Sequence, residues 1–211
     1  MAAFFERYCA SQLARPHGLA GRFFWGAWLN RANRAMNETA FQLVAVEPGD
    51  RILEVGFGGA ALFSDILAAK PEMAIGVELS EEMAARARRR FRRSIATGRA
   101  QILRGSVDRL PLRDDSVDKV CSLNTIYFWD DPLAAFREFA RVIRPRGMLI
   151  LGFDAAESLR EWPGHRHGFA LYEPSDVIRL ATEAEFGNTR IHQRADPRIG
   201  KIYCLEFEAP A

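Results

Sequence analysis

The sequence has few cysteines and none of the spacings that give cysteines a structural role. Its three cysteines, Cys9, Cys121 and Cys204, lie far apart and form no CxxC pair. An odd number of scattered thiols predicts neither a disulfide framework nor a zinc site. We therefore expect no disulfides and no bound metal, and the reducing cytoplasm as the location.

Long apolar runs and an excess of charge are also absent. No apolar stretch approaches the ~18 residues that span a bilayer, and the first residues lack the basic segment, apolar segment and cleavage site of a secretion signal. A formal net charge of +2 over 211 residues gives no global field that would attract nucleic acid or an anionic membrane. We expect neither secretion nor a membrane span, and a nucleic-acid partner is disfavoured. Peripheral contact with a membrane stays open.

From residue 48 onwards, short apolar runs alternate with helical patterns. Runs typical of strands cover 51–55, 73–79, 100–104, 117–124, 147–153, 188–193 and 201–207. Helical patterns cover 60–69, 83–95, 132–143 and 174–185. Because parallel strands need helical crossovers, this alternation predicts an α/β fold. We expect a doubly wound, Rossmann-like sheet of seven strands, mostly parallel, with helices on both faces and an antiparallel last strand.

We expect one compact domain overall, in which residues 48–211 form the sheet and residues 1–47 an N-terminal helical extension. The extension interleaves aromatic residues with arginines, and the spacing of Phe24, Trp28 and Leu29 predicts amphipathic helices. This segment could be a lid, a dimer face or a membrane anchor. The lid is favoured, because an open sheet otherwise leaves a site at its edge exposed to water.

A glycine-rich turn follows the first predicted strand and leads into a helix. It reads Glu54-Val55-Gly56-Phe57-Gly58-Gly59-Ala60. Ligands of parallel sheets bind at the carboxyl ends of strands, and glycines let the backbone turn sharply and approach a ligand closely. The glycine spacing also fits a dinucleotide fingerprint, but the carboxylate of Glu54 would repel a pyrophosphate and attract an ammonium group. A buried carboxylate that caps the loop backbone is the purely structural alternative.

An acidic residue also ends the second predicted strand. Glu78 lies 22 residues beyond Gly56, where a carboxylate can accept both hydroxyls of a ribose. It predicts a nucleoside ligand without choosing between NAD and S-adenosylmethionine (SAM). Met83, in the following helix, could pack on an adenine or belong to the core.

Five segments together carry a family resemblance. They are 51–59, 76–80, 110–118, 123–129 and 141–150. In this order and at these intervals, residues 43–153 resemble the methyltransferase type 11 group of class I SAM-dependent enzymes, which includes the ubiquinone and menaquinone C-methyltransferases. The resemblance does not extend to the two ends of the sequence, which would carry the choice of methyl acceptor.

The resemblance implies SAM as the cofactor, S-adenosylhomocysteine (SAH) as the product, and a set of cofactor-binding residues. It implies Glu54, Gly56 and Gly58 at the methionine end, Glu78 at the ribose, Ser106 and Val107 at the adenine edge, and Asn124 beside the reacting methyl group; Gly59, Leu79 and Met83 complete the predicted site.

Two positions depart from the family pattern. Ala60 stands where the family has a third glycine, and it fits provided that its backbone is helical. Ser106 stands where an acidic residue often meets the adenine amino group. Ser106 can still accept a hydrogen bond, and Asp108 is the alternative partner for adenine.

Methyl transfer from a sulfonium is an in-line displacement, which depends on alignment and exclusion of water more than on a strong base. Tyr127 and Trp129, just after the fourth predicted strand, could line an acceptor pocket or only pack the next helix. His165 and His167 lie in a loop on the binding side, where a base is plausible, although solvated loop histidines are commoner. The candidate catalytic residues are Tyr127, His165 and His167.

The function predicted from the sequence is SAM-dependent methyl transfer to a small, apolar or aromatic acceptor. Phospholipid and RNA are alternative acceptors, but the arginine run at 86–93 is better explained as a solvated helix end that complements the macrodipole. A nicotinamide-dependent oxidoreductase would need a second domain and gives Glu54 no role. A non-catalytic SAM-binding module is a further alternative, and no oligomeric state is indicated.

Overall fold

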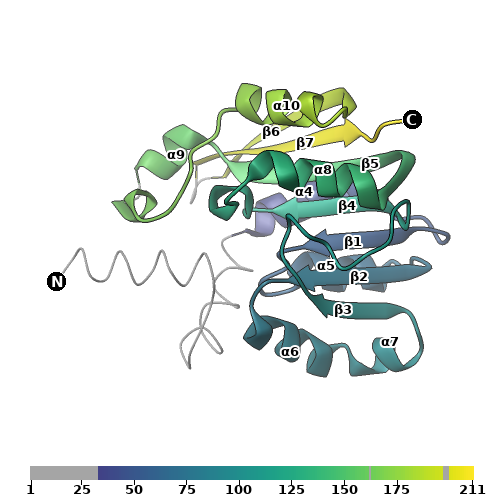
Figure 1. The fold of residues 1–211 in the computed structure, drawn as a ribbon. Coiled ribbons are helices and arrows are strands. Elements are labelled where there is room, and N and C mark those ends of the chain that lie inside the picture. The colour runs from purple at the N-terminus through teal and green to yellow at the C-terminus, as the bar shows by residue number, and fades with distance from the viewer. Residues whose placement is uncertain (1–32, 162, 197–199) are drawn as a thin grey trace.

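A computed structural model describes residues 33–161, 163–196 and 200–211, which build one seven-stranded sheet. Its strands are β1 (Arg51–Val55), β2 (Met73–Glu78), β3 (Ala100–Arg104), β4 (Val117–Leu123), β5 (Ile143–Asp154), β6 (Gly187–Asp196) and β7 (Gly200–Glu208). The order is β3-β2-β1-β4-β5-β7-β6, with β1 to β5 parallel and β7 antiparallel to both of its neighbours. In Figure 1 the arrowheads of β1 and β4 accordingly point opposite to that of β7. The predicted fold class is confirmed.

Helices connect the strands and cover both faces of the sheet. They are α4 (Arg34–Val44), α5 (Ala61–Ala68), α6 (Glu81–Arg90), α7 (Arg92–Ala96), α8 (Pro132–Val142), α9 (Ala156–Arg160) and α10 (Pro174–Glu183), with short 3-10 turns η2 (Ile126–Phe128) and η3 (Pro163–Arg166). Ser80 caps α6 by accepting from the backbone N–H of Met83. Asp131 caps α8, whose first turn contains Pro132, by accepting from Ala134.

The sheet separates two apolar layers, because alternate side chains of each strand point to opposite faces. On one face Ile52 of β1 packs with α4, α5 and α6. On the other face Leu53 and Val55 pack with α8 and α10. Figure 1 shows this division, with α8 and α10 in front of the sheet and α4 and α5 behind it.

Three elements differ from the sequence expectation. The helix expected over 83–95 is broken into α6 and α7 at Phe91, whose ring turns inward to within 5.0 Å of the Phe63 ring centroid. The strand expected over 147–153 starts earlier, because Ile143 already pairs with Val117 of β4. The described part of the expected N-terminal extension, α4, packs on the sheet.

Helix α4 is tied to the core by buried side chains. Met36, Ala40 and Val44 are fully buried. A Cβ added at Gly152 of β5 would lie 2.9 Å from the Met36 sulfur, so the glycine allows this close approach. The expected helices around Phe24 and Trp28, and the lid that they would form, lie outside the described residues.

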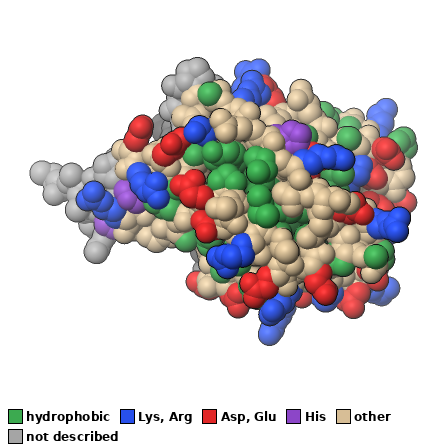
Figure 2. Space-filling view, turned by 90° about the horizontal axis from the view of Figure 1, so that it is seen from above, with side chains coloured by type: hydrophobic (Ala, Val, Ile, Leu, Met, Phe, Trp, Pro, Cys, Tyr) green, Lys and Arg blue, Asp and Glu red, His purple; other side chains and the backbone are tan. Residues whose placement is uncertain are grey.

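The surface seen from above Figure 1 mixes charges of both signs around a group of hydrophobic side chains, as Figure 2 shows. Ile191 of the edge strand β6 is 51% exposed. Among the described residues, no helix is long and apolar enough to cross a membrane. The same part of the chain contains no cluster of three or more His, Cys, Asp or Glu residues that could hold a metal ion.

Candidate functional site

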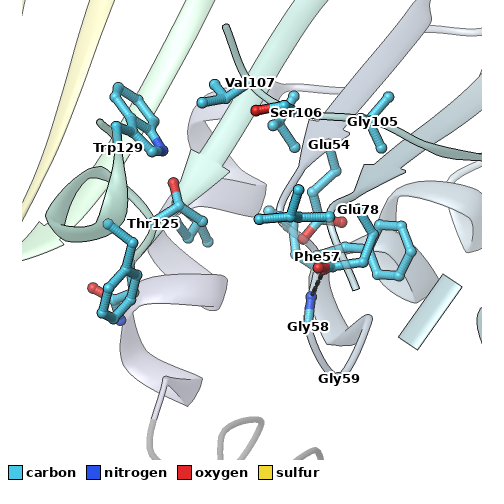
Figure 3. Close-up of a pocket in the computed structure, with 18 of the residues that line it drawn as sticks. Glu54, Phe57, Gly58, Gly59, Glu78, Gly105, Ser106, Val107, Thr125 and Trp129 are labelled. Atoms are coloured by element: carbon cyan, nitrogen blue, oxygen red, sulfur yellow. Dashed lines mark hydrogen bonds between the residues drawn. The ribbon is translucent and has the colours of Figure 1, made fainter. Parts of the chain in front are cut away.

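A pocket opens at the carboxyl ends of β1, β2 and β4, the edge of the sheet where the sequence places a ligand. Its floor is the loop from Glu54 to Gly59, and further walls come from the segments after β2, β3 and β4 and from the start of α4. Figure 3 shows Phe57, Gly58 and Glu78 on one side of the space and Thr125 and Trp129 on the other.

The glycine loop turns tightly between β1 and α5. The N–H of Gly56 donates to Val77 at 2.8 Å, and φ at this residue is +71°. A Cβ there would lie 2.4 Å from Thr125 Cγ2, so only glycine fits against the loop that follows β4. Gly58 also has a positive φ, +46°, but a Cβ at Gly58 would meet nothing within 4 Å. Its absent side chain leaves free space in the pocket.

The backbone of Ala60 corrects one expectation from the sequence. Its φ and ψ are 56° and 42°, so the residue is left-handed and not helical, a conformation that costs an L-residue about 1–2 kcal/mol. The position is held from outside the pocket by Arg90, which donates to the carbonyls of Gly59 and Ala60 at 3.2 and 3.4 Å. One member of the arginine run therefore supports the loop.

Glu54 is a buried carboxylate in the pocket wall. Only 5% of the residue is exposed, and Oε2 has no hydrogen-bond partner. Burial, together with the neighbouring carboxylates of Glu78 and Asp65, raises the pKa of Glu54 well above its usual value, while a backbone hydrogen bond from Phe63 acts in the opposite direction. A buried acceptor without a partner is costly, and a cation in the pocket would both pair with it and favour its ionised form.

Glu78 closes the opposite end of the loop. Its Oε2 accepts from the N–H of Gly58 at 3.1 Å and its Oε1 from the N–H of Ser80 at 3.0 Å. These two backbone donors fix the plane of the carboxylate at the end of β2, where the residue lines the pocket. The carboxylate is therefore held in a defined orientation at the position where the sequence predicts the ribose contact.

The segment after β3 supplies the third wall, from Gly105 to Asp108. It is braced from behind by α8. Glu138 accepts from the N–H of Leu110 at 2.8 Å and forms a double hydrogen bond with Arg141, whose guanidinium also donates to the carbonyls of Leu110 and Leu112. This brace holds Ser106 and Val107 at the pocket, although neither brace residue lines it.

Three side chains form a hydrogen-bonded series beside the end of β4. The backbone N–H of Asp154 donates to the hydroxyl oxygen of Tyr127. The Tyr127 O–H donates in turn to Asn124 Oδ1, with 2.9 Å between the two oxygens. Asn124 Nδ2 then donates to Asn33 Oδ1 at 3.1 Å. Asn124 has a φ of +54°, which asparagine tolerates better than most residues. Asn33 and Asn124 line the pocket, whereas Tyr127 lies behind them.

A second buried carboxylate lies near this series. Asp154 ends β5, and its Oδ1 has no hydrogen-bond partner. Burial first, and then the nearby charge of Asp196, raise the pKa of Asp154 to about 7. This carboxylate is not among the residues that line the pocket.

The pocket collects most of the predicted cofactor-binding residues. Those that line it are Glu54, Gly56, Gly58, Gly59, Glu78, Leu79, Ser106, Val107 and Asn124. Met83 does not; it is 2% exposed and belongs to the core, the alternative that its sequence left open. Trp129 lines the pocket, but Tyr127, His165 and His167 do not.

Several lining residues were missed from the sequence. They are Asn33, Asn37, Thr125, Phe128, Asp130 and Asp131. Asn33 and Asn37 are four positions apart at the start of a helix, and this spacing on one helical face was the available signal. The others directly adjoin positions that the sequence did single out.

All charged residues that line the pocket in the described part of the chain are acidic. They are Glu54, Glu78, Asp108, Asp130 and Asp131. Such a wall attracts a cation and disfavours phosphate groups, because the described residues add no arginine or lysine to it that would offset the charge of a phosphate. Fold and pocket together define a doubly wound α/β protein in which the described pocket wall favours a cationic ligand over a phosphate.

Comparison with known proteins indicates the class of protein and its ligand. Residues 53–151 match the family model described as methyltransferase domain. The chain is 27% identical over 127 residues to the uncharacterized methyltransferase YdaC of Bacillus subtilis, covering 60% of this chain and 68% of the relative. It is 31% identical to the erythromycin 3''-O-methyltransferase of Saccharopolyspora erythraea, over 65% of this chain but only 45% of that protein.

A solved structure shares the fold over almost the whole chain. A Haloferax volcanii protein in complex with the Trm112 methyltransferase activator superposes with a TM-score of 0.72 at 22% identity, covering 90% of this chain and 97% of that one. A methyltransferase domain over residues 53–151 and relatives named as methyltransferases support a SAM-dependent methyltransferase with SAM as its cofactor. The residues present fit SAM, because the partnerless Glu54 oxygen and the open space at Gly58 match its ammonium group and its bulk.

Proposed function

We propose that this protein transfers the methyl group of SAM to a small, apolar or aromatic acceptor by in-line displacement. SAM supplies a methyl group already activated by its sulfonium, so the protein mainly has to bind, align and exclude water. Glu54 and Glu78 hold the ammonium and the ribose, and the loop from Gly105 to Asp108 holds the adenine. The observation that carries the proposal is the buried Glu54 Oε2, which has no hydrogen-bond partner and lies in a wall to which the described residues contribute no cationic side chain.

Aromatic side chains support the apolar class of acceptor. Phe128 and Trp129 line the pocket directly after the end of β4, beside Asn124. Aromatic faces offer both apolar contact and attraction for a sulfonium. The name of the erythromycin 3''-O-methyltransferase supports an oxygen of a small organic molecule as one candidate accepting atom. A quinone-type C-methylation, which the sequence resemblance suggests, would use the same class of pocket.

Phospholipid and RNA acceptors are disfavoured by the same wall. Both carry phosphate groups, and the charged side chains that the described residues contribute to the lining are all acidic. We also propose a cytoplasmic location, which agrees with the free, buried thiols of Cys121 and Cys204. A lid formed by the N-terminal extension, residues 1–47, and a general base at His165 or His167 remain predictions.

The cofactor role of Glu54 is tested by calorimetry. Because binding of the SAM ammonium should ionise Glu54, SAM binding should release a proton, visible as a dependence of the heat on the ionisation enthalpy of the buffer. Glu54→Gln should lose this dependence and weaken SAM binding about 10-fold or more, as expected for a lost charged hydrogen bond. Glu183→Gln, the same exchange at an exposed position in α10, is the matched control.

The acceptor class is tested by SAH formation. Wild-type protein would be incubated with SAM and separate panels of phenols, quinols, aliphatic alcohols, phospholipid vesicles and RNA. Turnover with a member of the first three panels supports the proposal. Turnover confined to vesicles or RNA refutes the acceptor class, and SAM binding without turnover on any panel favours a non-catalytic binding module.

A further inference from the structure

The amino-acid tail of SAM carries a carboxylate as well as an ammonium group, and the pocket must accommodate both. Glu54 suits the ammonium. No arginine, lysine or histidine of the described residues lines the pocket, so the carboxylate has no cationic partner there. An anion can still be bound without a cation, provided that neutral N–H donors are aimed at it in advance.

Asparagine side chains supply such donors next to the glycine loop. Asn33, Asn37 and Asn124 all line the pocket. Asn124 follows β4, which pairs with β1 through Val55 and Ser122, and a Cβ on Gly56 would touch the next residue, Thr125. The asparagines thus adjoin the methionine end of the site and not its adenine end.

The orientation of these carboxamides is determined by a group that can only donate. The backbone N–H of Asp154 donates a hydrogen bond to the hydroxyl oxygen of Tyr127. The Tyr127 O–H therefore donates in turn to Asn124 Oδ1. Asn124 must then turn its Nδ2 toward Asn33, whose Oδ1 accepts at 3.1 Å. These two bonds turn each amide oxygen toward its partner in the series, and the Nδ2 groups of Asn33 and Asn124 retain N–H donors for a ligand.

Two observations indicate that the series is specific and not incidental. Tyr127 is 3% exposed and stacks on Phe169, so its hydroxyl is held in place. Asn33 precedes α4 in the N-cap position, yet its side chain does not cap that helix. The usual local role of an N-cap asparagine is given up in favour of the contact with Asn124.

We infer that Tyr127 is a positioning residue, which orients Asn124 and Asn33 so that their amide N–H groups bind the carboxylate of the SAM amino-acid tail. Tyr127 acts from behind the pocket wall and touches no ligand. This inference rests on the proposed function only in taking SAM as the ligand, and it is independent of the acceptor. It gives Asn33, a residue outside the region of family resemblance, a direct contact with the cofactor.

The test compares two ligands that differ in the carboxylate alone. SAH carries it, whereas decarboxylated SAH keeps the ammonium and the nucleoside. Titration calorimetry would give both affinities for wild type, Tyr127→Phe, Asn33→Asp and the control Tyr203→Phe, which removes a hydroxyl from β7 away from the pocket. Thermal unfolding would confirm that each variant is folded.

Tyr127→Phe should weaken SAH about tenfold and change the affinity for decarboxylated SAH less than about twofold, because one oriented contact to a charge is lost. Asn33→Asp still accepts from Asn124 but presents a carboxylate, so it should weaken SAH and leave decarboxylated SAH unchanged or tighter. In ¹⁵N-labelled protein, the Asn124 side-chain amide signals should shift in Tyr127→Phe and not in Tyr203→Phe.

Equal losses for both ligands, or no loss for either, would overturn the inference while leaving the cofactor assignment intact. If Tyr127→Phe does not fold, the pair of affinities for Asn33→Asp decides by the same criterion. If wild type binds neither ligand, the assignment of the pocket to SAM is itself wrong and the inference falls with it.

Discussion

Replacing Asp154 by asparagine should stabilise the protein, and by an amount that depends on pH. Burial and Asp196 raise the pKa of Asp154 from 3.8 to about 7 in the folded state. A difference of about 3 pH units, at about 1.36 kcal/mol per unit, corresponds to about 4 kcal/mol of folding free energy. The partnerless Oδ1 is consistent with a carboxyl that folding disfavours in its charged form.

The sign follows from which state holds the proton. Below about pH 4 the carboxyl is protonated in both states and folding incurs no penalty from it. As the pH rises to about 7, the unfolded chain loses the proton while the folded protein keeps it, so the free energy of unfolding falls. Above the folded-state pKa the full penalty is present. Asparagine never ionises, so Asp154→Asn should gain up to about 4 kcal/mol at pH 8 and almost nothing at pH 4.

Urea unfolding of wild type and Asp154→Asn at half-unit steps from pH 4 to pH 8 measures this difference directly. Asp65→Asn, an exposed substitution, serves as the control and should track wild type within about 0.5 kcal/mol. A stability difference between Asp154→Asn and wild type that is constant with pH, or that shrinks as the pH rises, would refute the electrostatic reasoning.

Two further substitutions follow from the glycine loop. Gly58→Val should abolish SAH binding in calorimetry without unfolding the protein, since its Cβ enters free space in the pocket. The control Gly98→Val, at a glycine that also has a positive φ and open space but lies outside the pocket, should bind SAH normally. Equal binding by both variants would contradict the loop assignment. Ala60→Gly should raise the free energy of unfolding by about 0.5–1 kcal/mol in urea titrations, because relief of left-handed strain exceeds the entropic cost of glycine; a less stable variant would show that the strain argument is wrong.

The sheet was predictable from sequence because most of its parallel strands are short apolar runs followed by a helix, with β3 the exception. Alternation alone therefore indicated the layers, and the caps at Ser80 and Asp131 are local signals that need no tertiary information. The break at Phe91 was not predictable, because the helical pattern continues through it and the inward turn depends on contact with Phe63. The early start of β5 likewise depends on pairing with Val117.

In the site, residues within short motifs were found and residues brought in by tertiary contact were not. Glu54 and Glu78 belong to strand ends and were placed at the pocket from their positions alone. Asn33 reaches it only because α4 packs across the sheet, a contact that no local pattern specifies. Tyr127 was singled out for the right neighbourhood, but its place behind Asn124 depends on the backbone of β5.

The acidic lining also has a consequence for the release of SAH. SAM carries one more positive charge than SAH, because the sulfonium becomes a neutral thioether once the methyl group has left. The carboxylates of the pocket wall therefore favour binding of SAM over binding of SAH. Methyl transfer removes the sulfonium charge of the bound ligand, so the acidic lining favours the exchange of SAH for a new molecule of SAM.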